Sequence, residues 1–278
     1  MPKAPSAPDA ELIAEVERQL ANTRESMAHL RARRDETRAY NQQRGDAHLA
    51  LSNFTSHGSQ HLDSGLVEFK LHADFAAATR EFAAIGDWFV FYDDILAAAQ
   101  RGELASLKPK LPLRSLLEPV LCLVLANDRA KLARLVGPEL EQIFELPGAV
   151  KGKIDRSWAW FVYALLRLAR GNPLGELAEQ EYPVRPKDVI EGYDLLLREA
   201  LRGHAVAFEA QRLKLEQDYP GRSKGARSST INWYGAGRIG QAMTFDVIGT
   251  VITRLAVLNG LGVKADSALY PADFIHRA

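Results

Sequence analysis

The sequence predicts an all-α fold, an irregular array of antiparallel helical hairpins that follows a long amphipathic N-terminal helix. Apolar stretches of helical period alternate with short polar turns, a layout typical of hairpins whose neighbours bury one another's apolar faces. The turns lie at 99–103, 126–129, 169–173 and 201–204. Their unequal spacing matches no regular solenoid repeat, and no stretch shows the sustained period-2 alternation of a strand.

The composition indicates a globular protein with a sizeable core. The chain has 278 residues, of which 47% are hydrophobic, enough for one large helical domain or two smaller ones. Its 35 basic and 35 acidic side chains give a formal net charge of zero, which argues against a nucleic-acid partner and a membrane partner. Because the apolar runs are too short to cross a membrane and the single cysteine cannot form an internal disulfide, we expect a cytoplasmic protein.

The first 48 residues are expected to form a flexible tail and the long amphipathic helix. Three prolines occur in 1–8, and Asp9 then fits the start of a helix that extends to about Tyr40. One face carries a seam of heptad-like spacing: Ile13, Val16, Leu20, Thr23, Met27 and Leu30. We favour packing of this seam on the chain's own body, and a homodimer through the N-terminal helix is the alternative. The arginines that follow are interpreted as helix C-terminal charge and solvated surface: Arg31, Arg33, Arg34, Arg38 and Arg44.

Residues 45–65 are rich in polar residues, glycine and histidine, which predicts a connection. The helical-hairpin domain is accordingly assigned to 49–278. Its helices are expected within 66–99 with a possible break at Gly86, and at about 113–126, 128–136, 158–169, 188–202 and 205–217. His57 and His61 stand four residues apart, with His48, Asp63 and Glu68 nearby, but the segment lacks a metalloprotease pattern and favours ordinary loop histidines, so no metal is assigned.

No segment carries a convincing catalytic motif, so we expect neither an enzyme nor a cofactor. Residues 235–240 match the pattern G-x-G-x-x-G, but a poor strand precedes them and no acidic residue follows about 20 positions later. Cys122 lies in an apolar run and is assigned to the core. An active site assembled from residues far apart in the sequence is the remaining enzymatic alternative.

Four residues are the candidate partner-binding site: Trp88, Tyr92, Asp93 and Asp94. A solvated helix face is the simpler interpretation of these carboxylates. Acidic charge beside amphipathic aromatic side chains nevertheless suits a protein interface better than an isolated active site.

The C-terminal stretch combines an aspartate-led apolar helix, a glycine turn and a closing Tyr-Pro segment, at 245–256, 259–263 and 269–275. In this combination the chain resembles the bacterial immunity protein 49 family, whose members are all-helical cytoplasmic proteins. A second helical immunity group, paired with polymorphic nuclease toxins, is similar through its Tyr-Pro-x-Asp pattern, here Tyr270 to Asp273. The resemblance implies an immunity protein that does no chemistry and neutralises a cognate bacterial toxin or effector by binding it directly. A helical-repeat adaptor or secretion chaperone for an exported effector is the alternative, because it would use the same fold.

Overall fold

The computed structural model describes residues 10–72, 74–106, 110–135, 140–171, 190–225 and 245–276, and it confirms the all-α fold. The helices of the N-terminal half are α1 (Ala10–Ala32), α2 (Arg34–Arg44), α3 (Ala47–His72), α4 (Phe75–Ala83), η1 (Ala84–Trp88), α5 (Phe89–Gln100), η2 (Glu103–Ser106), η3 (Leu113–Leu116), α6 (Leu117–Leu125) and α7 (Arg129–Leu135). Those of the C-terminal half are α8 (Leu140–Ile143), α9 (Lys153–Ala169), α11 (Tyr193–Arg202), α12 (Ala205–Gly225), α15 (Val247–Leu258) and α16 (Ala272–Ile275). The elements β1 (Leu111–Pro112) and β2 (Phe144–Glu145) form a minimal parallel pair.

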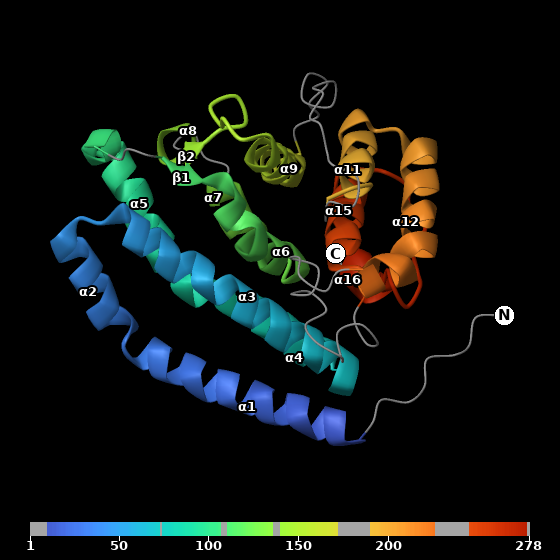
Figure 1. Ribbon diagram of the computed structural model, residues 1–278, viewed down its shortest axis with the longest axis horizontal. Helices are drawn as coiled ribbons and strands as arrows, with labels where there is room; N and C mark the ends of the chain where they lie inside the picture. The colour runs from blue at the N-terminus through green and yellow to red at the C-terminus, as the bar shows by residue number, and fades with distance from the viewer. Residues whose placement is uncertain are drawn as a thin grey trace.

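The N-terminal helix belongs to an antiparallel hairpin. α1 runs back along α3, with α2 at the bend between them (Figure 1). The helix that was expected to be continuous to about Tyr40 is interrupted at Arg33, where α2 begins in a new direction. Leu20 and Met27 of the predicted seam are buried within the chain. These two side chains therefore pack against the chain's own residues and are not available for a coiled coil with a second copy.

The prediction that residues 45–65 form a connection is wrong beyond the short turn at Gly45 and Asp46, because 47–65 belong to the long helix α3. Its glycines are sites of close helix packing and not turns. A Cβ atom on Gly65 would lie 2.2 Å from the ring of Phe82 in α4, and one on Gly58 would lie 2.8 Å from Pro119 in α6. Glycine lets these helices approach closely at a cost in helix propensity. The predicted domain boundary between residues 48 and 49 falls in the first turn of α3.

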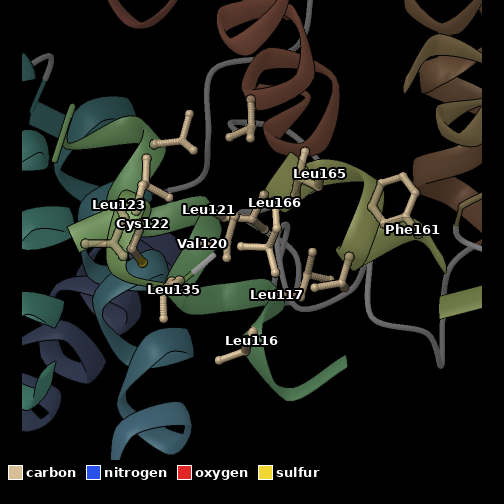
Figure 2. Close-up of a cluster of buried hydrophobic side chains, with 14 of the residues drawn as sticks. Leu116, Leu117, Val120, Leu121, Cys122, Leu123, Leu135, Phe161, Leu165 and Leu166 are labelled. Atoms are coloured by element: carbon tan, nitrogen blue, oxygen red, sulfur yellow. The ribbon is translucent and has the colours of Figure 1, made fainter. Parts of the chain in front are cut away.

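α6 lies at the centre of the core. Its side chains from Val120 to Leu125 are all buried, and the helix contacts α3, α4, α7, α9 and α15. Figure 2 shows leucines of α6 together with Leu165 and Leu166 of α9 in one buried cluster, which includes Cys122. Pro119 is tolerated because it lies in the first turn of α6, where its missing N–H has no helical acceptor. The expected core position of Cys122 is confirmed.

The C-terminal helices α11, α12, α15 and α16 gather at the other end of the molecule from α2 (Figure 1). α12 extends to Gly225, beyond the end expected near Gln217. α15 ends at Leu258 and is capped by Asn259, and Gly260 follows in the left-handed region with φ +88°, a conformation that glycine adopts at little cost. Among the described residues, no helix is both long enough and apolar enough to cross a membrane.

The start of α15 is fixed by a buried carboxylate. Asp246 is 1% exposed and caps the helix by accepting a hydrogen bond from the Gly249 amide at 2.9 Å. It also accepts hydrogen bonds from the hydroxyls of Tyr193 at 2.8 Å and Tyr270 at 2.7 Å. Burial and the neighbouring charge of Asp246 raise the pKa of Tyr270 well above its usual value. The aspartate-led helix and the Tyr-Pro segment of the C-terminal pattern are therefore two parts of one structural cluster.

Candidate functional site

The two aromatic residues of the predicted partner-binding site lie in the core. Trp88 is 2% exposed, and its indole N–H donates a hydrogen bond to Nε2 of His61 at 3.0 Å. Tyr92 is fully buried against the rings of Phe54 and Phe89. Neither side chain offers a surface to a partner, which corrects the expectation that amphipathic aromatics here face outward. α5 is buried on most sides, and the helices that cover it, such as α3, are distant in the sequence. The local sequence therefore does not show that these aromatic side chains are covered.

The two carboxylates of that site are on the surface but already paired. Asp94 accepts two hydrogen bonds from Arg38, at 2.8 and 2.9 Å, and a third from Gln42 at 3.1 Å. Asp93 forms an ion pair with Arg134. The hydrogen bond to Asp94 is the main cause of a raised pKa for the Arg38 guanidinium. Arg38, interpreted from the sequence as solvated surface, thus docks α2 onto α5.

A pocket of about 490 Å³ lies beside Asp94, between α2, the start of α3, the second half of α5 and η2. This volume is in the range of about 300–1,000 Å³ that is typical of ligand sites. We name it the Asn41 pocket. It is lined by Asn41, Gln42, Gly45, Asp46, Ala47, Ala50, Asp94, Ile95, Ala97, Ala98, Arg101, Glu103 and Leu104.

Asn41 is the polar group of this pocket that the fold leaves unsatisfied. Its side chain is 4% exposed, and neither Nδ2 nor Oδ1 has a hydrogen-bond partner among the described residues. Asn41 is one of the residues that line the pocket, and both of its amide atoms are buried. A buried amide without partners costs about 1–3 kcal/mol of stability. The fold therefore carries this cost at a residue that lines a pocket.

The charged groups of the pocket are mostly acidic. Oδ1 of Asp46 caps α3 by accepting a hydrogen bond from the Leu49 amide at 3.0 Å, while its Oδ2 has no partner within the described part of the chain. Glu103 pairs with Arg101 through contacts of 2.6 and 2.8 Å. With Asp94, three carboxylates therefore line the pocket against one guanidinium. Small apolar side chains such as Ala50 complete the lining.

The structure does not assemble the histidine-containing set into a metal site. His57 is stacked on Trp88 and contacts Gln60 through Nδ1, and burial lowers its pKa, which keeps the ring neutral. Glu68 forms an ion pair with Arg24 of α1. Within the described ranges, no group of three or more histidine, cysteine or acidic residues is positioned to hold a metal ion.

Two further carboxyl groups, those of Asp63 in α3 and Glu118 in α6, are partly buried. Burial, with a smaller contribution from the charge of Glu118, raises the pKa of Asp63 to about 7. Burial also raises the pKa of Glu118 and, more strongly, that of the Cys122 thiol. The Cys122 thiol is therefore protonated.

A second pocket of about 550 Å³ lies beside the start of α9, with Lys151 and Asp155 in its lining. None of the buried, unpartnered polar atoms found among the described residues belongs to its lining. The Asn41 pocket is therefore the stronger candidate site. The G-x-G-x-x-G segment 235–240 and the proline-rich stretch 1–8 lie outside the described residues.

Sequence reasoning identified Asp94 but missed Asn41 and Asp46. No motif marks these two residues, because the pocket forms only when the turn between α2 and α3 meets α5 and η2. The left-handed Gly45, with φ +61°, is the one local signal of this turn. Comparison of the chain with models of protein families, with curated proteins and with solved structures found no match in any of the three.

Proposed function

We propose that this chain is an immunity protein, which binds a cognate bacterial toxin in the cytoplasm and neutralises it by direct protein–protein interaction. The observation that carries the proposal is the Asn41 pocket, a recess in a helical scaffold where a buried amide lacks both of its hydrogen bonds. Groups held at a cost to stability are expected where function needs them. The resemblance of 245–275 to the immunity protein 49 family supports the same class of protein.

The pocket suits recognition of a protein better than chemistry. Tight inhibition depends on a few buried contacts within a rigid surface, and the pocket walls are helices fixed by the core and by the pair between Arg38 and Asp94. Asp93 and Asp94, the partly exposed members of the predicted partner-binding set, lie on α5, and Asp94 lines the pocket. A toxin loop that inserts here would contact both the amide and the acidic rim.

An adaptor or secretion chaperone for an exported effector is the second candidate. It is favoured by apolar side chains that stand out on α11 and α12: Leu195 is 48%, Leu213 44% and Val206 88% exposed. Exposed apolar side chains that form one contiguous patch mark a surface that binds another chain. This surface lies at the end of the molecule away from α2 (Figure 1).

The test is affinity capture of the tagged chain from its native cells, followed by expression of the recovered partner with and without the chain. An immunity protein predicts a partner that kills cells alone and is silenced in a stable complex. Recovery of a harmless exported protein favours the adaptor. The pocket variant Asn41→Leu is expected to lose protection, whereas Asp266→Asn, which changes an exposed residue of the C-terminal segment, is expected to retain it.

A further inference from the structure

We propose that the Asn41 pocket recognises a basic peptide segment, in which a lysine or arginine residue is held together with its own backbone amide. The inference rests on the proposed function and identifies the chemistry of the toxin segment that enters this site. It follows from three features of the pocket: its unmet amide, its acidic lining and its apolar walls.

The unmet amide selects an amide-containing ligand. Asn41 offers a donor at Nδ2 and an acceptor at Oδ1, and both lack partners. A guanidinium or ammonium group only donates, and a carboxylate only accepts, so either one would leave half of the side-chain amide unsatisfied. A peptide group presents one donor and one acceptor and can satisfy both atoms. This binding requires the buried Asn41 side chain to turn toward the pocket.

The acidic lining selects a cation beside that amide. Oδ2 of Asp46 has no hydrogen-bond partner within the described part of the chain, whereas Asp94, which also lines the pocket, is already paired with Arg38, so Asp46 is the carboxylate that remains for a ligand. A charge-assisted hydrogen bond to a carboxylate is about twice as strong as a neutral one. The lining also contains alanines and Ile95, which match the aliphatic stem of a lysine or arginine side chain.

The test uses three capped peptides that differ only at the central residue: acetyl-Gly-Lys-Gly-amide, its norleucine counterpart and its glutamate counterpart. Each is titrated into the purified chain labelled with ¹⁵N, and binding is measured from the shifts of the asparagine side-chain amide signals. Norleucine keeps the aliphatic stem and removes the charge. We expect the lysine peptide to bind about tenfold more tightly than the norleucine peptide and the glutamate peptide to bind least.

Two variants separate the roles of the two residues. Asp46→Asn keeps an oxygen that caps α3 and removes the charge, so it should abolish the preference for lysine, while the matched variant Asp266→Asn should leave it unchanged. Asn41→Leu should weaken the binding of all three peptides. The inference is overturned if no peptide binds up to about 10 mM, if lysine and norleucine bind equally to the unmodified chain, or if Asp46→Asn retains the preference.

The peptide experiment is independent of any toxin. If the lysine peptide binds as expected but the chain protects no cell from its partner, the proposed function fails and the pocket chemistry stands. If the chain protects cells, and Asp46→Asn and Asn41→Leu protect equally well while no peptide binds, the pocket chemistry fails and the proposed function stands.

Discussion

Replacing Asn41 by leucine should stabilise the protein, which is unusual for a substitution of a buried residue. The fold buries both amide atoms of Asn41 without a hydrogen bond, and such a group costs about 1–3 kcal/mol. Leucine removes this cost, and it is also a better helix former than asparagine by a few tenths of a kcal/mol. The adjacent cavity of about 490 Å³ has room for the larger side chain, so overpacking is not expected.

We therefore expect Asn41→Leu to raise the free energy of unfolding by about 1–3 kcal/mol, measured by equilibrium unfolding in urea. Asn53→Leu is the matched control, because the side chain of Asn53 in α3 donates to the Leu49 carbonyl at 2.9 Å. It removes a satisfied amide and should change stability by less than about 1 kcal/mol. A loss of more than about 1 kcal/mol in Asn41→Leu would show that the amide is satisfied in solution, and the reasoning about the pocket would fail with it.

Three further substitutions test the fold. Gly65→Ala places a methyl group 2.2 Å from the Phe82 ring, so it should destabilise by about 1–3 kcal/mol in urea despite a gain in helix propensity; an unchanged or higher stability would contradict the close packing. Asp246→Ala leaves two tyrosine hydroxyls and a helix amide without their acceptor and should cost about 3–4 kcal/mol, measured as a loss of thermal and urea stability; a cost below about 1 kcal/mol would contradict the cluster. For Asp63 the folded pKa is about 7 against an ordinary value of 3.8, so the carboxyl favours folding below about pH 4 and its contribution is lost as pH rises through 7. Asp63→Asn should therefore stabilise by up to about 4 kcal/mol at pH 8 and hardly at pH 4; a gain that does not depend on pH would contradict the raised pKa.

The sequence predicted those helices whose apolar periodicity directly reflects burial. α6, α9 and α15 have apolar runs that the core absorbs, and Asp246 was identified as the start of the last of them. The error over α3 has a physical cause. Glycine, serine and histidine usually indicate a turn, but in α3 Gly58 and Gly65 make room for neighbouring helices.

The candidate site was harder to predict because it depends on contacts between distant segments. The pattern around Trp88 and Tyr92 shows amphipathic aromatics, but not that α3 covers them. Arg38 and Asp94 are 56 positions apart, so no local pattern pairs them. The role of Asn41 is the hardest to predict, because whether its amide finds a hydrogen-bond partner depends on the whole fold. The neighbouring residues in the sequence do not indicate it.

The contrast between Asp246 and Asn41 separates structural from functional polar burial in this chain. Asp246 is the more costly group to bury because it carries a charge, yet donors from α11, α15 and the closing segment meet it, so it joins three parts of the fold and needs no ligand. Asn41 is cheaper to bury and has no partner among the described residues. A leucine there would remove that cost in a single substitution, and the pocket beside it has room for the change. Under the proposed function, a partner supplies the hydrogen bonds that Asn41 lacks, so the α2 end of the molecule is the first place to test for binding.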